Sequence, residues 1–419
     1  MTDAKRRALD LAARYVCPDR VRTFEAMGVD LVIGRREGHR LWDLDGRELL
    51  DFHLNGGVFN LGHRHPELVA ALRDALDTLD VGNHHFPSLA RAELAEALVR
   101  TMPPGELQYV VFSPSGGEAI DVAIKSARHA TQRRTIVSIE GGYHGHTGLA
   151  LATGHERFAQ LFLSAGAGED FVRVPFNDLD AMEVALGRHQ VAAVILETIP
   201  ATCGFPLPAP GYLPGVKALC ERHGALYVAD EVQTGLGRTG RMWGVECFGV
   251  APDILVTGKG LSGGLYPIAA TVLAPRAARW LEQDGWAHLS TFGGAEIGCR
   301  VAQKVLEITT RPGVLAGVHA LSDRLAAGLE RVRASHPDWL VEIRRQGVVM
   351  GLRFAHERGG QLMTRALYDA GLWAMFAGFD ASVLQFKAGL LLDAASCDEA
   401  LGRFERGLRR CVELLGRPA

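Results

Sequence analysis

Short apolar runs alternate along the middle of the chain with segments whose apolar residues recur at helical spacing. The runs are rich in β-branched residues, which is typical of buried parallel strands, and they cover residues 135–139, 191–196, 225–229 and 254–256. Segments between them, such as 214–222, predict helices. This alternation predicts an α/β protein with a mainly parallel sheet and right-handed crossovers.

The two ends of the chain show a different pattern. Residues 1–60 predict a short helix followed by two or three strands. From about Ala302 a long helix leads to a C-terminal segment with a strand near 347–354 and a closing helix from Cys397. We expect a large domain and a smaller α+β domain that is built from both ends and forms the lid side of a cleft. The expected ranges are 1–60 and 319–419 for the smaller domain and 61–318 for the large one.

Composition narrows the possible partners and the compartment. The chain has 419 residues, 47% of them hydrophobic and 22% charged, and a net charge of −3, so no nucleic-acid or membrane surface is predicted. Seven scattered cysteines lack CxxC spacing and indicate reduced thiols. The first residues lack the apolar core of a signal peptide, and no run of about 20 apolar residues occurs. We therefore expect a cytoplasmic enzyme that acts on a small molecule.

Two of the apolar runs end beside a charged residue. Asp230 follows one run and Lys259, between two glycines, follows the next. Because ligands bind beyond the carboxyl ends of parallel strands, both side chains face one crevice. A desolvated lysine amine suits a Schiff base with an aldehyde, and an aspartate on a pyridine nitrogen makes that ring an electron sink, as in enzymes that use pyridoxal 5'-phosphate (PLP). The alternative is a surface lysine in a glycine-rich turn with solvated acids.

The surrounding motifs make this interpretation specific. DEVQTGLGRTG, followed by PDILVTGKG, resembles the class III PLP-dependent aminotransferases of fold type I, over about Trp42 to Arg406. The resemblance implies a seven-stranded, mainly parallel sheet, PLP as cofactor, Lys259 as Schiff-base lysine and Asp230 on the pyridine nitrogen. It also implies that Val232 packs on one ring face and that Gln233 reaches the ring hydroxyl. Among the six lysines, Lys259 alone follows an apolar strand and lies between glycines.

A small-residue turn precedes the helix predicted after residue 117. The turn Ser115-Gly116-Gly117 offers free N–H groups and the positive end of the helix dipole to an anion. An ordinary N-cap by Ser113 or Ser115 is the alternative. The turn resembles the family's SG(S/T)EA element, which implies that it holds the PLP phosphate.

Three further segments complete the implied cofactor site. In EGGYHGHTG, Tyr143 can stack on a ring and His144 can form a hydrogen bond, although an aromatic residue after a strand is often part of the core. The family's (F/Y)HG element puts Tyr143 opposite Val232. Glu197 ends an apolar run, where the family has a glutamate near the reacting centre; a solvated loop acid is the alternative. Thr291 lies in a segment that resembles STFGGNP, whose threonine contacts the phosphate of the neighbouring subunit, so a homodimer with shared active sites is implied.

Two loops are candidates for the substrate mouth. In LNGGVFNLGHRHP, Gly56-Gly57 indicates either a close backbone approach or a plain tight turn. The resemblance implies that Asn55, Gly56 and Phe59 line the mouth. A second wall is implied by Asn83-His84-His85-Phe86, of which His85 and Phe86 are the substrate candidates; a loop before the helix near Ala90 is the alternative.

Departures from the family pattern bear on the substrate. The family's VLRxxPPL arginine, which binds the α-carboxylate of glutamate, is replaced by Gln385 in VLQFKAGLLL, and glutamine is no bidentate cation. Lys387 lies on the same strand face and can substitute if it points inward. His146 stands where ornithine and acetylornithine members have arginine, and a tyrosine of the ornithine enzyme aligns near Gly56. The usual carboxylate anchors are therefore missing, unless an arginine has moved elsewhere.

These departures favour a PLP-dependent aminotransferase for a primary amine or aldehyde of an amino sugar, aminocyclitol or polyamine. Family members from aminoglycoside antibiotic biosynthesis act on such groups. A PLP-dependent epimerase, racemase or aminomutase is the alternative, because the same machinery can return the proton to the opposite face. The sequence leaves open the exact substrate, the amino donor, the direction and any assembly beyond a dimer.

Two other classes of protein fit less well. The segment 235–240 matches GxGxxG, which suggests a dinucleotide oxidoreductase, but the following RMWGVECFGVAPD is a poor helix and no acid ends a second strand about 20 residues on. Histidine pairs occur at 63 and 65, 84 and 85, and 144 and 146 without HExxH or a comparable ligand spacing. We therefore expect no metal site.

Overall fold

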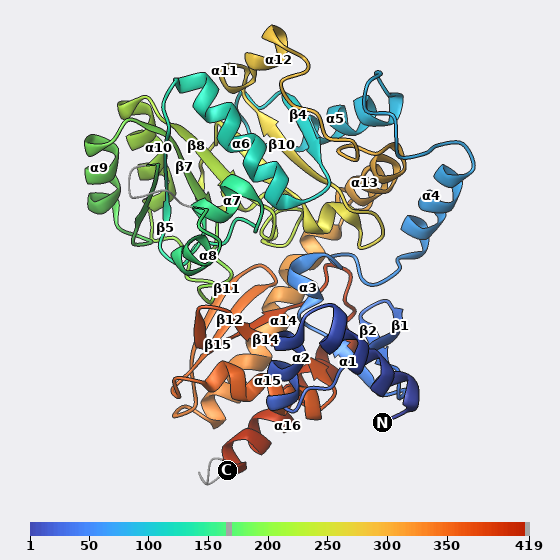
Figure 1. The fold of residues 1–419 in the computed structure, drawn as a ribbon. Coiled ribbons are helices and arrows are strands. Elements are labelled where there is room, and N and C mark those ends of the chain that lie inside the picture. Colours follow the sequence, from blue (N-terminus) through green and yellow to red (C-terminus); the bar gives the residue numbers. More distant parts are fainter. Residues whose placement is uncertain (165–169, 415–419) are drawn as a thin grey trace.

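The large sheet is the part of the fold that carries the candidate site. In the computed structural model, which describes residues 1–164 and 170–414, seven of the described strands form it in the order β4-β10-β9-β8-β7-β5-β6. The strands are β4 (Tyr109–Ser113), β5 (Thr135–Ile139), β6 (Phe171–Val174), β7 (Val191–Glu197), β8 (Leu226–Asp230), β9 (Ile254–Thr257) and β10 (Ala269–Leu273). The sheet lies in the upper half of Figure 1 and is covered by helices.

The sheet is mainly parallel, as the alternating pattern predicts, with one difference. β5, β6, β7, β8 and β9 run parallel, whereas β10 is antiparallel to both β9 and β4. A parallel return would need a crossover of about a dozen residues or more, usually a helix. The connection 258–268 is short and contains only the 3₁₀ turn η2 (Lys259–Ser262), so the chain turns back beside β9.

Both faces of the sheet are packed. On one face α6 (Gly116–Thr131) lies on the sheet with alanines such as Ala119 and Ala123. On the other face α10 (Tyr212–His223) contributes Leu213 and Val216. Every residue of β7 and β8 is buried, because successive strand residues point to opposite covered faces. This explains why these strands are continuous apolar runs.

The remaining elements of this part surround the sheet. They are α4 (Pro66–Leu76), α5 (Leu89–Thr101), α7 (Gly148–Thr153), α8 (Glu156–Leu161), α9 (Leu179–Arg188), η1 (Gly244–Phe248), α11 (Pro275–Ala278), α12 (Trp280–Gln283) and α13 (Glu296–Thr309). None of the described helices is both long and apolar enough to cross a membrane.

Segments from both chain ends share the smaller part of the molecule. β3 (Glu48–Asp51) pairs in parallel with β13 (Leu372–Trp373), and this joins the two ends in the sheet β1-β2-β3-β13. Figure 1 shows both termini in this lower part, with α3 (Leu54–Gly57) where the two parts meet. The other strands are β1 (Ile33–Glu37), β2 (Arg40–Asp43), β11 (Leu340–Gln346), β12 (Val349–Phe354), β14 (Met375–Ala377) and β15 (Asp380–Lys387), and the helices are α1 (Asp3–Tyr15), α2 (Pro18–Ala26), α14 (Val314–Ser335), α15 (Gly359–Asp369) and α16 (Ala394–Leu414).

Two helices differ from the expected pattern. The sequence predicts one N-terminal helix, but the structure has two, because the chain turns at Cys17 and Pro18 starts α2. The long helix from Ala302 is interrupted before α14, where Gly313 adopts a left-handed φ of +87°. The domain boundaries at 60/61 and 318/319 stay predictions, and residues 165–169 and 415–419 of the two expected domains lie outside the described residues.

A buried lysine fixes α1 to the small sheet. Lys5 Nζ lies 2.8 Å from Asp30 Oδ2, 3.0 Å from Asp43 Oδ2 and 3.2 Å from Asp45 Oδ2. Burial opposes the charge of Lys5, but the three carboxylates outweigh it and raise its pKa above the ordinary value. Removing one partner of such a buried cluster leaves uncompensated charge, so this cluster holds α1 in place.

Candidate active site

Three neighbouring strand ends deliver the central groups of the site. Glu197 and Asp230 end β7 and β8 and lie opposite each other in the parallel register, and Lys259 follows β9. They line a cavity of about 380 Å³ together with eight other predicted site residues, namely Ser115, Gly116, Gly117, Tyr143, His144, His146, Val232 and Gln233. Segments that are far apart in the sequence thus meet at one edge of the sheet.

Lys259 is not a surface lysine. Its φ of +40° is a left-handed value that L-residues rarely adopt. Nζ has no hydrogen-bond partner within the described part of the chain, and burial lowers the pKa of the amine, against the opposing charges of Asp230 and Glu197. A Cβ built on Gly56 would lie 3.1 Å from Lys259 Cε. The amine is therefore unpaired, more easily deprotonated than a free lysine amine and close to the backbone of α3.

Asp230 is held in a fixed orientation. Its Oδ2 lies 2.8 Å from His144 Nδ1, and its Oδ1 accepts a hydrogen bond from the Val232 N–H at 3.0 Å. Burial disfavours the charged form of His144, but the hydrogen bond and charge of Asp230 outweigh it and raise the pKa of the imidazole. His144 Nε2 is shielded from solvent and has no partner among the described residues. The imidazole therefore holds this carboxylate in one orientation.

Glu197 is a buried positioning group and not a solvated loop acid. Its carboxylate accepts the N–H groups of Tyr143 at 3.0 Å and Ala201 at 3.2 Å. Burial raises the pKa of Glu197 to about 6, with Asp230 adding to the shift and His144 opposing it. Tyr143, which Glu197 anchors through its backbone, is 37% exposed, so it is not a core aromatic residue.

The turn before α6 forms a backbone cradle. Ser115 Oγ caps the helix by accepting the Glu118 N–H at 3.3 Å, so the predicted N-cap is present. The first N–H groups of a helix have no intrahelical acceptor. A Cβ on Gly116 would lie 3.2 Å from Val232 Cγ1, and a Cβ on Gly117 would lie 2.9 Å from Thr147 Oγ1. The glycines thus leave room for an anion at the helix N-terminus.

These features fit PLP. The unpaired Lys259 amine suits the cofactor aldehyde, the oriented Asp230 carboxylate suits a protonated ring nitrogen, and the cradle before α6 suits a phosphate. Val232 and Tyr143 both line the same cavity, where they can contact the faces of a ring. The structure therefore brings together the donor set that the sequence predicts.

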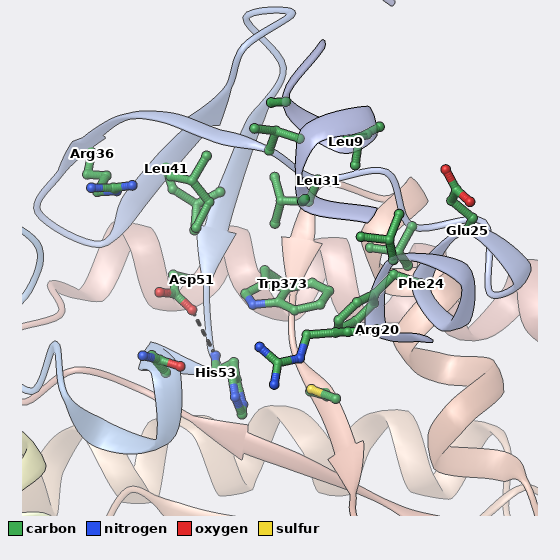
Figure 2. A pocket seen from close by; sticks show the side chains of 18 of the residues that line it. Leu9, Arg20, Phe24, Glu25, Leu31, Arg36, Leu41, Asp51, His53 and Trp373 are labelled. Carbon is green, nitrogen blue, oxygen red and sulfur yellow. Dashed lines mark hydrogen bonds between the residues drawn. The ribbon is translucent and has the colours of Figure 1, made fainter. Parts of the chain in front are cut away.

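The predicted substrate residues separate into groups. Asn55 and Phe59 line a second cavity of about 680 Å³ beneath α1 and α2 (Figure 2). His85 and Phe86 line a third cavity of about 360 Å³, and Thr291 is exposed on the loop before α13. Within one chain none of these five residues lines the cavity at Lys259.

Gln385 and Lys387 lie on one face of β15, as their spacing predicts. Gln385 Nε2 donates to the Ala201 carbonyl at 3.1 Å, and Lys387 Nζ donates to Gln385 Oε1 at 2.5 Å. Lys387 is fully buried, and its Nζ lies 5.7 Å from the centre of the Phe205 ring. Since Ala201 also donates to Glu197, this pair lies directly behind the strand-end groups.

The sequence interpretation missed Arg238. This arginine is 1% exposed, donates to Asn60 Oδ1 at 3.0 Å and to the carbonyl of Ala388 at 3.2 Å, and has no ion pair with any residue that the structure describes. Burial lowers its pKa to about 10, so it stays charged at neutral pH. The GRTG part of the long motif contains it, but nothing in the motif predicts burial without an acid. Arg238 ties the motif loop to the loop after β15.

Two alternative classes can be compared with the geometry. The GxGxxG segment 235–240 is followed by the short 3₁₀ helix η1 and not by an α-helix, so it offers no helix N-terminus to a dinucleotide phosphate. The described histidines, cysteines and acids form no cluster of three or more that is placed to hold a metal ion.

Comparisons with known proteins agree with this geometry. The family model "Aminotransferase class-III" matches residues 24–408. An uncharacterised aminotransferase of Archaeoglobus fulgidus is 47% identical over 394 residues, which are 94% of this chain and 92% of that protein. The solved ornithine aminotransferase of Toxoplasma gondii has a TM-score of 0.88 at 26% identity and covers 98% of this chain and 96% of its own. The taurine:2-oxoglutarate aminotransferase of Bifidobacterium kashiwanohense, solved with PLP and glutamate, has a TM-score of 0.83 at 26% identity and covers 91% and 93%.

Proposed function

The chain belongs to the class III aminotransferases, and we propose that within this family it moves an amino group to or from a primary amine or aldehyde whose reacting carbon carries no carboxylate. Membership in this family confirms three predictions: the fold is PLP fold type I, the cofactor is PLP, and the reaction is amino-group transfer. Amino sugars, aminocyclitols and polyamines share the proposed feature, and they stay the sequence-based predictions for the substrate.

One observation carries this proposal. Both ends of the Gln385 amide are occupied by the protein, Nε2 by the Ala201 carbonyl and Oε1 by the Lys387 amine. A glutamine in that state offers a substrate carboxylate neither a charge nor a free pair of donors. The position of the family's carboxylate-binding arginine is therefore closed to a carboxylate.

Lys387 does not replace the arginine. Burial lowers its pKa well below the ordinary value, and the charges of Arg238 and Lys259 add to this shift, while Asp51 opposes it. The neutral amine is therefore favoured, and it already donates to Gln385. A neutral lysine lacks the charge that holds a carboxylate in a low-dielectric site.

His146 offers no cation either. Its ring packs on Tyr143 and Phe158, with ring centres 5.1 Å and 4.7 Å apart, and partial burial lowers its pKa. A neutral imidazole at neutral pH can hydrogen-bond to a hydroxyl but cannot pair with a carboxylate. The three positions considered from the sequence thus support a substrate without an α-carboxylate.

The residues of this chain have separate tasks in the reaction. Lys259 Nζ would hold PLP covalently, Asp230 would keep its ring nitrogen protonated, and the Gly116–Gly117 backbone would bind its phosphate. PLP, when bound, supplies an electron sink for the carbon that bears the substrate nitrogen. When its amine is free, Lys259 would take the proton from that carbon as general base and deliver it to the cofactor side as general acid. Its lowered pKa favours the basic form that this transfer needs.

We place the complete site in a homodimer in the cytoplasm. His85, Phe86 and the exposed Thr291 do not line the Lys259 cavity of their own chain. Phe86 is 73% exposed, and the nearby Trp286 and Phe292 are 64% and 54% exposed. Such a patch suits a protein interface, and a second copy would bring Thr291 to the neighbouring cradle. The free cysteines suit a reducing compartment.

The test is to add amines to the purified holoenzyme and follow the visible absorption of the bound cofactor. Glutamate, an aminoglycoside and a diamine are compared. Loss of the band with the sugar or the diamine, and not with glutamate, supports the proposal. A band lost with glutamate at an equal rate contradicts it. A band that persists while solvent deuterium enters the substrate carbon identifies an epimerase in place of an aminotransferase.

A further inference from the structure

The short turn α3 has an unusual backbone conformation. All four of its φ values are positive, +52° at Leu54, +47° at Asn55, +72° at Gly56 and +97° at Gly57. This is the longest run of positive φ among the residues that the structure describes. Left-handed values are unfavourable for residues with a Cβ and usually occur singly. Such strain persists only where the surrounding contacts enforce it, and it is most frequent at functional sites.

The strained turn lies against the candidate catalytic lysine. A Cβ built on Gly56 would lie 3.1 Å from Lys259 Cε and 3.0 Å from Gln233 Oε1, so the backbone itself forms the wall at this point. A Cβ on Gly260 would lie 3.3 Å from the carbonyl oxygen of Gly57. Lys259 is left-handed as well, with a φ of +40°. Two strained segments from distant parts of the sequence therefore face each other beside the reacting amine.

Asp51 holds the start of this turn. Its Oδ1 accepts the N–H groups of His53 at 3.0 Å and of Leu54 at 2.8 Å. Its Oδ2 lies 2.8 Å from His63 Nε2, and the residue is 3% exposed. Asp51 ends β3, which pairs with β2 and β13. The carboxylate therefore ties the first residue of the strained run to the small sheet.

His63 contacts the other end of the turn. The rings of His63 and Phe59 are stacked, with their centres 3.9 Å apart. The Phe59 N–H donates to the Leu54 carbonyl at 3.3 Å, which closes the turn. His63 is 1% exposed, and its backbone N–H and carbonyl both pair with Gly38. The pair of Asp51 and His63 thus holds the turn at both ends.

We propose that Asp51 and His63 are positioning residues, which hold the left-handed turn 54–57 against Lys259 and so fix the direction of its amine during the reaction. This inference rests on the proposed role of Lys259. The contact at Cε leaves no room for water on this side of the lysine and keeps its side chain in the cavity that Asp230 lines. Reaction is fast only when the reacting group is held close to its attack geometry.

Asp43 offers a matched control in the same small sheet. Its Oδ1 accepts two backbone N–H groups at 2.8 and 2.9 Å, and its Oδ2 lies 3.0 Å from Lys5 Nζ. It is 4% exposed, nearly the same as Asp51. The pattern of contacts is therefore the same, but the turn that Asp43 holds, 45–47, lines no part of the Lys259 cavity.

The first readout needs no substrate, because the visible band of the purified holoenzyme is followed against pH. In Asp51→Ala the midpoint should rise by about half a pH unit or more, since a displaced wall admits water and water favours the protonated nitrogen at Lys259. Loss of a negative charge alone would lower the midpoint, so a rise is distinct from a direct charge effect. The charged groups that face Lys259, namely Asp230, Glu197 and Arg238, are unchanged.

Two variants complete this titration. Asp43→Ala should leave the midpoint where it is in the unaltered protein. Asp51→Asn lacks the charge but keeps an acceptor for the two N–H groups, so it should not raise the midpoint either. Equal midpoints in Asp51→Ala and Asp43→Ala, or a rise in Asp51→Asn as large as in Asp51→Ala, would overturn the inference.

The second readout separates reaction from binding. With hexylamine, a primary amine without a carboxylate, the limiting rate of cofactor-band loss should fall about 100-fold in Asp51→Ala, the cost of a misplaced reacting group. The concentration at half-saturation should stay within about threefold, because binding is retained. Asp51→Asn should restore most of the rate. A loss in Asp43→Ala as large as in Asp51→Ala would assign Asp51 to stability alone and contradict the inference.

A second pair of variants covers an Asp51→Ala protein that does not fold. His63→Ala removes both the stacked ring and the bond to Asp51, whereas His63→Gln keeps a donor for the carboxylate. The midpoint should rise more in His63→Ala than in His63→Gln, and equal midpoints would count against the inference. If amines react but none of these variants changes midpoint or rate, the inference fails and the proposed function stands. If no amine changes the cofactor band, the proposed function fails, while the pH titration still decides the inference.

Discussion

The cavity at Lys259 and the cavity beneath α1 and α2 are built in different ways. The first is framed by strand ends and a backbone turn, and its charged groups Asp230, Glu197 and His144 are held by hydrogen bonds. The second is framed by helix and strand side chains, and Arg20 lies in its wall without an ion pair to a described residue. The first cavity is therefore fixed by hydrogen bonds between distant segments, whereas the second is shaped by the packing of helices on a sheet.

The largest effect should come from Lys259→Ala, which disables the first cavity alone. Turnover should fall by about 10³-fold or more, because the covalent attachment and the general base are lost together. Lys304→Ala, a surface lysine paired with Glu307, is the control. A Lys259→Ala protein that retains turnover would refute the mechanism.

The close approach of the α3 backbone to Lys259 is tested next with Gly56→Ala. The new Cβ would press on Lys259 and Gln233, and a misplaced reacting group costs about 10²-fold in rate. Gly46→Ala is the control, because Gly46 also has a positive φ, +85°, but has nothing within 4 Å of the added Cβ. Both variants should lose about 1 kcal/mol of stability to backbone strain. Equal activities of the two variants would show that the close approach of Gly56 to Lys259 has no role in the reaction.

The electrostatics of the first cavity predict a pH dependence of stability. Glu197 has a pKa of about 6 in the folded protein, above its ordinary 4.5, so its protonated form is favoured by folding. The stabilisation is full below about pH 4.5 and is lost as the pH rises through about 6. Glu197→Gln should remove about 2 kcal/mol of this pH dependence, seen as a flatter profile in urea unfolding of the holoenzyme. Arg20→Gln should leave the profile unchanged.

The smallest effect is expected when a cation is restored at residue 385, where the family has its carboxylate-binding arginine. Gln385→Arg should raise the rate of cofactor-band loss with glutamate by about 10-fold, the value of one added ion pair at a partly desolvated site. Rates with hexylamine should not change, because it carries no carboxylate. A variant that gains nothing with glutamate would weaken the argument from the missing arginine.

The predictable part of the molecule follows from local sequence. The positions of Asp230, Lys259 and the Ser115 turn could be predicted because each follows a strand that the sequence shows as an apolar run. The carboxyl ends of parallel strands meet at one edge of the sheet. Gln385 and Lys387 could be placed on one face of β15 because successive side chains of a strand alternate between its two faces. Their roles in this chain stay predictions, since only the positions are given by the structure.

The remaining features depend on contacts that no local pattern contains. The antiparallel β10 follows from a short return, and the interruption before α14 follows from a single left-handed glycine. Arg238 is buried against a carbonyl that lies far along the chain. The cavity beneath α1 and α2 exists only when helix and sheet are packed together.

The antiparallel return of β10 also has a consequence for the order of folding. Lys259 lies on the connection between β9 and β10, and β10 is seated between β9 and β4, which come from distant parts of the chain. Pairings over such separations form late, after the local helices. During refolding, the ability to capture the cofactor should therefore appear with the closing of the sheet, later than the gain of helical signal.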